Sequence, residues 1–538
     1  MQSTRLTLKR SLRLVFLVAT VGLLAEALSA CSTASPAPAQ VAPAAPPAAV
    51  PSSDGAPAAP GAAAPAAGAP SASTTPPLKL LQTSPEKGNV GTKFSLTGEG
   101  LPPGKEVQLF WGTVDGSYVV KPTAETVQFF ERKFEPKRVP FGKGGIDAQG
   151  RFSATFAAPE DYGEIHDIYV MLDGQDVAKG GFRIIRNVTI TPLEGPVGTP
   201  ITITTNGLAW KPYEGTLGVR WDNNYTGFIA ATTTKGTVTA QIRAAGPPGK
   251  HYIDIGHASA TYPYLNFEQS PVAHIPNFQF VFTVTKDNGA PPATLDWPAD
   301  SLATDGASIA KTTISAEPVS SMPAARGTVS PGSGPILSKA ALQASGLPGE
   351  ASVDLRWVTA VGNRVSPSGW SLKDIPLGKT QTTKEGALKT TFEVPDDLGG
   401  WHAVKLISGE KVLTEVPFFV ERSFVAVSPA RVKAGETFTV QIKGVGWTEL
   451  DNGAAVTYDN SFIGYACGFN SQGDVTMYLT ATGGPGTHLI DLYPMIYQGQ
   501  GKPPWSYETP ILSFKQDAPG LALGYRIPAF RLAIEVVQ

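Results

Sequence analysis

Cysteine and histidine are scarce in this chain of 538 residues, which has two cysteines, Cys31 and Cys467, and six histidines. The sequence also lacks the Cys/His spacing of a zinc site, a nucleophile elbow and a glycine-rich phosphate loop. We therefore predict no catalytic residues, no bound metal and no cofactor. With so little cysteine, hydrophobic cores rather than disulfides must stabilise the folded part.

Charge is also low. Charged residues make up 16% of the chain, and the formal net charge is −2. This balance gives no reason to expect nucleic acid as a partner. Glycine and proline are abundant by contrast, with 57 and 48 residues. Because such a chain is poor in helix formers and rich in turn formers, we predict many short strands.

The apolar run near the N-terminus, Leu14–Leu24, is too short to span a bilayer comfortably. Basic residues precede it: Arg5, Lys9, Arg10 and Arg13. After it comes Leu28-Ser29-Ala30-Cys31, which resembles the lipobox of bacterial lipoproteins in all four positions. The resemblance implies that residues 1–30 are a signal peptide, cut before Cys31, and that the Cys31 thiol receives a diacylglyceryl group.

Lipidation of Cys31 would hold the chain at a membrane, because two or three acyl chains anchor stably. We predict a cell-envelope location: the outer membrane in a Gram-negative host, as Ser32 at position +2 suggests, and otherwise the outer face of the cell membrane. The alternative is an ordinary cleaved signal peptide with a chance cysteine. Once Cys31 carries lipid, Cys467 has no partner for an intrachain disulfide.

A linker, residues 31–77, follows the predicted cleavage site. Beyond Cys31 it is almost entirely Ala, Pro, Ser, Gly and Thr, with Asp54 as its only charge. Such a composition cannot form a core. If semi-extended, it would reach up to about 140 Å at about 3.1 Å per residue. We predict a second, shorter linker at residues 287–325.

An internal repeat is the strongest signal in the chain. Residues 188–255 match residues 425–492 at a constant offset of 237, without a gap. The shared pairs include Trp210/Trp447, Asp222/Asp459 and His251/His488. The segments before each copy also match more loosely, with the pairs Trp111/Trp357, Asp161/Asp397 and His166/His402. We predict four domains, A (78–186), B (187–286), A′ (326–422) and B′ (423–516), and a C-terminal tail (517–538).

Each predicted domain has the two-residue periodicity of β-strands. Ile201-Thr202-Ile203-Thr204 and Phe438-Thr439-Val440-Gln441 alternate apolar with polar residues. Thr191-Pro192, Gly195-Pro196 and Gly198-Thr199 before a V-T-I-like strand resemble the opening of IPT/TIG-type immunoglobulin-like domains. The resemblance implies an all-β fold of four tandem immunoglobulin-like sandwiches and no catalytic residues.

Several polar motifs recur between the copies, and we favour structural roles for them. Asp161-x-Gly163-x-x-His166 resembles the turn into strand F, where the carboxylate caps the turn and Gly supplies a positive φ. Asp222-Asn223 indicates a hairpin turn. Strand alternation places His251 and Asp254 on opposite faces, so they cannot form a dyad within their strand. A site that combines the Asp-Asn turn with the histidine strand stays open as the alternative.

Two long inserts between strands F and G are the candidate ligand-binding loops. Hairpin connections usually have two to five residues, and connections much longer than that are usually functional or disordered. The candidate residues are His257, Tyr262, Tyr264 and Phe267 in domain B, and Tyr493, Tyr497, Trp505 and Tyr507 in domain B′. Tyr and Trp offer large amphipathic contact area for a glycan or an envelope protein. The alternative is that these aromatic side chains pack on a neighbouring domain.

The function we predict is non-catalytic: a membrane-anchored lipoprotein with a binding, adhesion or envelope-scaffolding role. The alternative is a carbohydrate-active enzyme or an accessory carbohydrate-binding lipoprotein. We prefer the first because duplicated sandwiches leave no room for a separate catalytic domain. The expected partners are the membrane, through Cys31, and a glycan or envelope protein.

Overall fold

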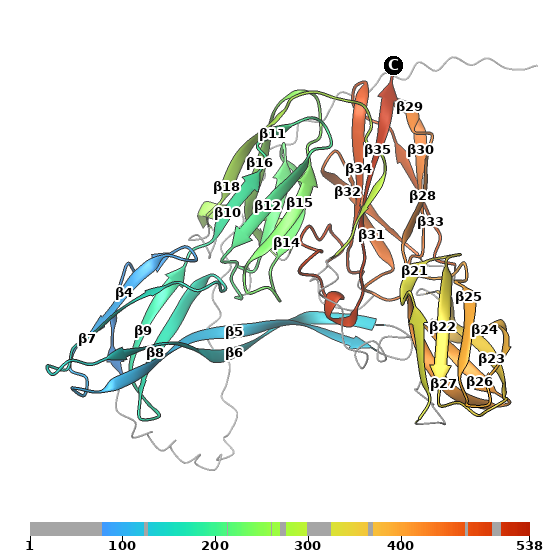
Figure 1. Cartoon of the computed structure of the whole chain (residues 1–538). Coiled ribbons are helices and arrows are strands. Elements are labelled where there is room, and N and C mark those ends of the chain that lie inside the picture. Colours follow the sequence, from blue (N-terminus) through green and yellow to red (C-terminus); the bar gives the residue numbers. More distant parts are fainter. Residues whose placement is uncertain are drawn as a thin grey trace, which may run out of the picture. The chain divides into compact units, whose positions relative to one another are not determined.

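The computed structural model describes residues 78–538 except 123–126, 212–213, 260, 270–275, 299–323, 364–368, 469–471 and 498–506. The predicted signal peptide, Cys31, the rest of the predicted 31–77 linker and Trp505 therefore lie outside the described residues, as does the side chain of Phe267. The described part is a series of β-sandwiches with two short 3₁₀ helices, η1 (Phe267–Gln269) and η3 (Leu521–Leu523) (Figure 1). No helix in that part is long and apolar enough to cross a membrane.

Domains A and A′ each pair a three-stranded sheet with a larger sheet. In A the smaller sheet has the order β2 (Gln82–Ser84), β4 (Lys93–Gly98), β7 (Phe152–Ala157). The larger one has the order β1 (Lys79–Leu80), β9 (Gln175–Ile184), β8 (Glu164–Leu172), β5 (Glu106–Pro122), β6 (Val127–Gly145), with β3 (Lys87–Gly88) also on β9. In A′ the smaller sheet has the order β20 (Arg326–Ser330), β22 (Lys339–Ser345), β25 (Leu388–Glu393). Its larger sheet has the order β21 (Ser333–Pro335), β27 (Lys411–Glu421), β26 (Gly400–Ser408), β23 (Ser352–Gly362), β24 (Trp370–Gln381).

Domains B and B′ repeat this arrangement. The smaller sheet of B has the order β10 (Asn187–Thr191), β12 (Pro200–Asn206), β15 (Val238–Arg243). Its larger sheet has the order β11 (Glu194–Gly195), β18 (Phe278–Val284), β16 (Gly249–Ser259), β13 (Thr216–Trp221), β14 (Asn224–Ala230), with β17 (Tyr262–Pro263) on β16. The smaller sheet of B′ has the order β28 (Ser423–Ser428), β30 (Thr437–Lys443), β33 (Val475–Thr480). Its larger sheet has the order β19 (Thr294–Asp296), β35 (Ala529–Val537), β34 (Gly486–Tyr493), β31 (Gly453–Tyr458), β32 (Ser461–Cys467), with β29 (Arg431–Lys433) on β35.

The first strand of every domain changes sheets at a proline. Its first half lies in the smaller sheet, and its second half pairs in parallel with the strand that we call G, which is β9, β18, β27 or β35. Strand F is β8, β16, β26 or β34, and strand C is β5, β13, β23 or β31. A cis X-Pro peptide bond separates the halves at Ser84–Pro85, Thr191–Pro192, Ser330–Pro331 and Ser428–Pro429. Proline fits this position because it offers no N–H to a strand partner. The shared sheet order confirms the predicted fold of four tandem immunoglobulin-like sandwiches.

The C-terminal boundary of domain B′ was predicted wrongly. Residues 529–537 are strand G of B′, paired with β34 along its length, rather than part of a tail. The side chains of Phe530, Leu532 and Ile534 are fully buried in the core of B′. The alternation of these residues is the strand pattern that the sequence offered, but a long insert separates them from strand F.

The predicted 287–325 linker also needs correction in its first part. Thr294–Asp296 is a strand that pairs with β35 at the edge of B′. Before it, the Asp287 carboxylate accepts hydrogen bonds from the Thr487 amide and hydroxyl, both 2.7 Å. Residues 299–323 lie outside the described residues.

A long two-stranded ribbon distinguishes domain A from the others (Figure 1). Strands β5 and β6 pair from Glu106 to Pro122, with bulges at Leu109/Phe110 and Val119/Val120. Gly116 lies in the ribbon where a Cβ would overlap the carbonyl oxygen of Thr232 in domain B. The ribbon therefore lies against domain B, and glycine allows the two backbones to come this close.

Candidate functional site

One histidine recurs at the same place in all four sandwiches. His166, His251, His402 and His488 each lie on strand F, two residues before the residue that pairs with an aromatic side chain of strand C. The ring stacks on or tilts against that aromatic residue, with centroid distances of 4.6, 5.1, 4.5 and 5.4 Å. In each case Nε2 lies 2.7–2.8 Å from the carbonyl oxygen four residues earlier. The sequence comparison paired A with A′ and B with B′, but it did not find that all four share this motif.

The second ring nitrogen distinguishes the two kinds of domain. In A and A′, Nδ1 of the histidine faces the backbone oxygen of Gly112 or Val358, at 2.8 and 2.9 Å. In B and B′, Nδ1 of His251 lies 2.6 Å from a carboxylate oxygen of Asp222, and His488 lies at the same distance from Asp459. The Asp-Asn turn and the histidine strand therefore meet, as the alternative interpretation required.

The contact between the Asp-Asn turn and the histidine has a structural role rather than a catalytic one. Asp222 and Asn223 have φ of 48° and 68°, which confirms the predicted hairpin turn. The Asp222 carboxylate also accepts a hydrogen bond from the Tyr252 amide at 2.9 Å. Both ring nitrogens of His251 already face acceptors, so neither one points toward a substrate position.

In domain B′ the pair changes the titration of the histidine. Burial lowers the pKa of His488. The hydrogen bond and charge of Asp459, together with the Gly484 carbonyl and Asp287, raise this pKa by a larger amount, so the net shift is upward. The protonated ring can donate to the Asp459 carboxylate and to the Gly484 carbonyl at once. These two acceptors therefore stabilise the protonated form of His488.

The Asp161 motif caps its turn as predicted. One Asp161 oxygen accepts from the Trp111 indole at 2.8 Å, and the other accepts from the Thr113 hydroxyl at 2.8 Å and the Tyr162 amide at 2.9 Å. Asp397 makes the same three contacts in domain A′. A buried carboxylate with three donors is satisfied, so these residues stabilise the sandwich.

The reason given for Gly163 was wrong. The left-handed residue is the next one, Glu164, with φ of 91°. Gly163 is required because a Cβ there would overlap the carbonyl oxygen of Gly207 in domain B, and Gly399 meets Gly444 in the same way. The Gly163 amide also donates to Leu208 at 3.0 Å. These glycines allow close backbone contact between consecutive domains.

The repeated tryptophan, Trp210 or Trp447, completes each A–B junction. The ring of Trp210 lies 5.2 Å from His166, and that of Trp447 lies 5.5 Å from His402. The strand F histidine is therefore held between its own strand C tryptophan and a tryptophan of the next domain. At the same junctions burial lowers the pKa of Arg186 to about 10, with Glu214 next to it.

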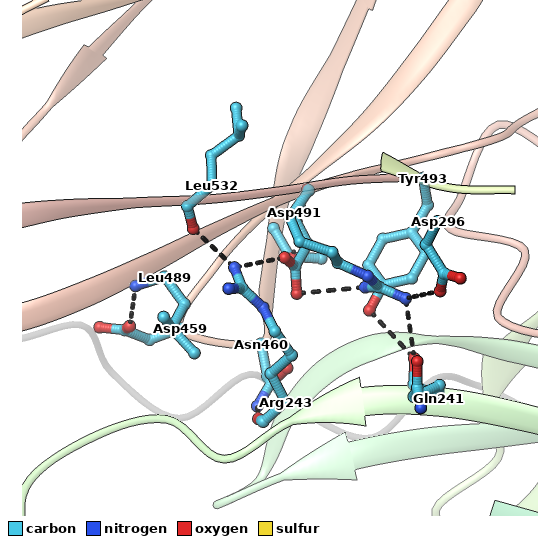
Figure 2. A network of polar contacts seen from close by, with 11 residues as sticks. Gln241, Arg243, Asp296, Asp459, Asn460, Leu489, Asp491, Tyr493 and Leu532 are labelled. Carbon is cyan, nitrogen blue, oxygen red and sulfur yellow. Dashed lines mark hydrogen bonds and ion pairs between the residues drawn. The ribbon is translucent and has the colours of Figure 1, made fainter. Parts of the chain in front are cut away.

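A network of buried ion pairs connects domain B with domain B′ (Figure 2). Arg243 of β15 lies 2.5 Å from Asp491 of β34 and donates to the Leu532 carbonyl at 2.6 Å. Arg531 pairs with the same Asp491 at 3.3 Å and with Asp296 at 3.1 Å. Two arginines thus face two aspartates, and Asp296 also pairs with the more exposed Lys515, so each of these buried charges has a partner of opposite sign. Burial raises the pKa of the neighbouring Tyr493 to about 12.

The F–G insert of B′ adds a segment to the edge of domain B. Phe228 of β14 donates its amide to Pro510 at 3.0 Å and accepts from the Leu512 amide at 2.9 Å, a parallel bridge to Ile511. The Ala230 amide donates to the Ser513 hydroxyl at 3.1 Å. Through this segment one hydrophobic core continues from B into B′. An otherwise open strand edge is thereby covered.

Asp517, a fully buried residue of the same insert, joins three domains. One of its carboxylate oxygens accepts from the Thr232 amide at 2.8 Å and from the Tyr118 hydroxyl of the domain A ribbon at 2.8 Å. The other accepts from the Thr233 amide and hydroxyl, at 2.8 and 2.7 Å. Burial, followed by the charge of Asp517, raises the pKa of Tyr118 well above its ordinary value.

Two of the predicted ligand-binding residues of the B′ insert pack on domain B, and a third is half-buried. Tyr493 and Tyr507 are buried, and the Tyr507 ring meets Phe228 edge-on at 5.1 Å, so the prediction of ligand binding is wrong for both. They pack on domain B, as the alternative interpretation held. Tyr497 is half-buried, with its ring 6.0 Å from that of Tyr465.

The domain B loop is more open. Tyr262 is 53% exposed, and its ring lies 5.5 Å from that of Tyr225. Tyr264 is half-buried. His257 is 5% exposed, so it does not present its ring to a ligand, and its prediction as a binding residue is wrong. Phe267 and Trp505 remain predictions, because their side chains lie outside the described residues.

The sequence interpretation missed Asp517, Arg243 and Arg531. A lone acidic residue in a Gln-Asp-Ala-Pro segment carries no signal of burial, and neither arginine is shared between the two copies. Within the described residues no group of three or more His, Cys, Asp or Glu side chains is arranged to hold a metal ion. Cys467 is half-buried at the end of β32.

Comparisons with known proteins gave fold-level likeness alone. No family model and no curated protein matches the chain. Among solved structures, Salmonella alpha-2-macroglobulin is 10% identical, with a TM-score of 0.16 over 84% of this chain and 30% of its own. The ICAM-5 D1–D4 ectodomain fragment is 11% identical, with a TM-score of 0.17 over 85% and 99% of the two chains. Invasin, a bacterial integrin-binding protein, is 11% identical, with a TM-score of 0.17 over 77% and 76%. Values this low support no inference about ligand or activity, and the sheet order of the chain itself establishes its tandem immunoglobulin-like sandwiches.

Proposed function

We propose that this chain is a lipid-anchored protein of the bacterial cell envelope with a non-catalytic binding, adhesion or scaffolding role. Cys31, at the +1 position of the lipobox-like sequence, would carry the lipid, and the 31–77 linker would separate it from the sandwiches. A proline-rich linker is a semi-rigid spacer, which suits a protein that presents folded domains at a distance from a membrane.

One observation carries the scaffolding role: the insert that connects strands F and G of B′ is used to lock domains together. Asp517 accepts hydrogen bonds from the domain A ribbon and from domain B, and the Arg243–Asp491 pair is buried nearby. Most interdomain interfaces within a chain allow relative motion unless they are large and hydrophobic. A continuous core and paired buried charges favour a fixed arrangement of B and B′.

The test of anchoring uses the two cysteines as a matched pair. Full-length protein is expressed in a bacterial host with an alkyne-labelled palmitate, and label and membrane fractionation are measured for the Cys31→Ala and Cys467→Ala variants. We expect wild type and the Cys467→Ala chain to be labelled and membrane-bound, and the Cys31→Ala chain to carry no label. Equal labelling of Cys31→Ala and wild type would refute the anchor.

The non-catalytic role has its own test. Wild-type protein is incubated with a panel of glycan and ester substrates, and product formation is measured. We expect no turnover. Turnover by wild type that continues through many cycles would overturn the proposal in favour of the carbohydrate-active alternative.

A further inference from the structure

A groove of about 1130 Å³ lies where domain A meets domain B. Its lining includes Lys87 of β3, Ile165 of β8 and Arg183 of β9, together with Arg186 from the connection between β9 and β10 and Pro276 of domain B. Small-molecule pockets usually measure roughly 300–1,000 Å³. The groove is therefore large enough for a segment of polypeptide.

The equivalent place at the A′–B′ junction is filled by this chain itself. In A the outward-facing pair across strands F and G is Ile165–Arg183, and in A′ the same register holds Trp401–Phe419. The Trp401 indole donates to the Leu523 carbonyl at 3.0 Å. The Tyr525 ring meets Phe419 edge-on at 6.1 Å and is 2% exposed.

This occupied copy shows what such a groove accommodates. The segment 520–527 of the B′ insert is a stretch of polypeptide with one short 3₁₀ helix, η3. It contributes an aromatic side chain and a backbone carbonyl to the Trp401–Phe419 pair. An acceptor surface that holds a peptide segment is therefore present in the fold, and among the described residues no such segment lies on the A–B copy.

The lining of the A–B groove differs in chemistry from its filled counterpart. Ile165 is 50% exposed where Trp401 is covered. Arg183 takes the position of Phe419, and in the strand register it pairs with the exposed Lys87. Glu86 is the exposed acidic residue beside them, whereas the buried Glu164 lies 3.4 Å from Lys211. Two accessible cations beside an apolar side chain favour an acidic ligand.

Arg186 also lines this groove. Its side chain is 6% exposed, and its Nη2 donates to the Glu214 carbonyl oxygen. Its Nε and Nη1 have no hydrogen-bond partner in the described structure. The equivalent Arg422 of the filled A′–B′ junction likewise donates from Nη2 to the Asp451 carbonyl oxygen and has an Nε without a partner in the described structure, so this feature is common to both junctions and does not indicate a ligand.

We propose that the A–B groove binds a peptide segment of another protein, with an apolar side chain against Ile165 and a carboxylate near Arg183 and Lys87. The proposal rests on the binding role above and names its ligand class. The occupied A′–B′ copy favours a peptide over a glycan because the contact there is made by a backbone carbonyl and one aromatic side chain.

The test uses full-length protein and a displayed library of random twelve-residue peptides. Peptides enriched on wild type are synthesised with a fluorophore, and their affinities are measured by anisotropy. The Arg183→Glu and Lys87→Glu variants probe the groove, and Lys384→Glu, an exposed site on domain A′, is the matched charge control. We expect enriched peptides to carry Asp or Glu beside an apolar residue, and to bind each groove variant at least tenfold more weakly but the control unchanged.

Three results would overturn the proposal: no enrichment, equal binding to the groove variants and the control, or competition by neutral glycans but not by acidic peptides. Lys87→Glu keeps the test decisive if Arg183→Glu does not fold, because the Lys87 side chain is exposed. Failure here is distinct from failure of the anchor, since labelling at Cys31 does not depend on the groove.

Discussion

Domains B and B′ match without a gap over 68 residues, yet their F–G inserts differ in what they contact. In B, the insert carries the exposed Tyr262, the first residue of strand β17, which pairs with β16 of the same domain. In B′, the insert packs against domain B. Its Tyr507 is buried, and its Asp517 carboxylate accepts hydrogen bonds from three donors of domain B. The repeated residues build each sandwich, and the inserts determine how the sandwiches are joined.

Aromatic content alone does not identify a binding loop in this chain. Tyr262 and Tyr507 occupy related inserts and belong to the same residue type, but only one of them is available to a partner. What separates them is the surface each insert meets. Phe228 of domain B has an open strand edge that the longer insert covers with residues 510–513.

The largest effect is expected for Asp517→Ala. Four donors lose their acceptor, and an unsatisfied buried group costs roughly 1–3 kcal/mol. We expect the free energy of the first urea unfolding transition to fall by on the order of 4 kcal/mol. Glu268→Ala, which changes an exposed acidic residue of the domain B insert, is the control and should stay within about 0.5 kcal/mol of wild type. Similar values for the two variants would mean that the B′ insert does not lock the domains.

A second effect separates the two tyrosines. Tyr507→Ala removes a buried ring that packs on Phe228 and should cost about 3 kcal/mol in the same unfolding measurement. Tyr262→Ala removes a ring that is 53% exposed and should cost less than about 1 kcal/mol. If the Tyr262 variant lost as much stability as the Tyr507 variant, the contrast between the inserts would be wrong.

The sequence predicted the features that depend on local chemistry. The Asp222-Asn223 turn, the Asp161 cap and the strand at Ile201–Thr204 follow from turn residues and period-two alternation, and all three are confirmed. The contacts of Asp517 could not be predicted, because its donors Thr232 in domain B and Tyr118 in domain A lie 285 and 399 residues away in the sequence. Strand G of B′ has the alternation of a strand, but the long insert between Tyr493 and Ala529 separates it in sequence from β34, so their pairing was not predicted.

A smaller effect is expected where consecutive domains touch. In Gly163→Ala the new Cβ meets the backbone oxygen of Gly207, which a rotamer change cannot relieve. Overpacking of this kind costs about 2 kcal/mol, and we expect faster proteolysis between domains A and B. Gly181→Ala on the adjacent strand has ordinary contacts for its Cβ and serves as the control. Equal proteolysis of the two variants would show that the junction tolerates a side chain at Gly163.

The smallest effect is a pH dependence that belongs to domain B′. The pKa of His488 is raised in the folded chain, so its contribution to stability is complete below the unfolded value near 6.5. That contribution is lost as the pH rises through the folded pKa. The stability difference between wild type and His488→Gln should therefore shrink from pH 6 to pH 8.5. A difference that grows over this range would contradict the charged pair with Asp459.

Amide hydrogen exchange in the unaltered chain tests most directly whether the B′ insert is part of the domain B sheet. The Leu512 amide donates to Phe228, and the Phe228 amide donates to Pro510. We expect both amides to exchange slowly and with the same opening free energy, because one event exposes both. Exchange of Leu512 at the rate of an unstructured peptide, with Phe228 still protected, would contradict it.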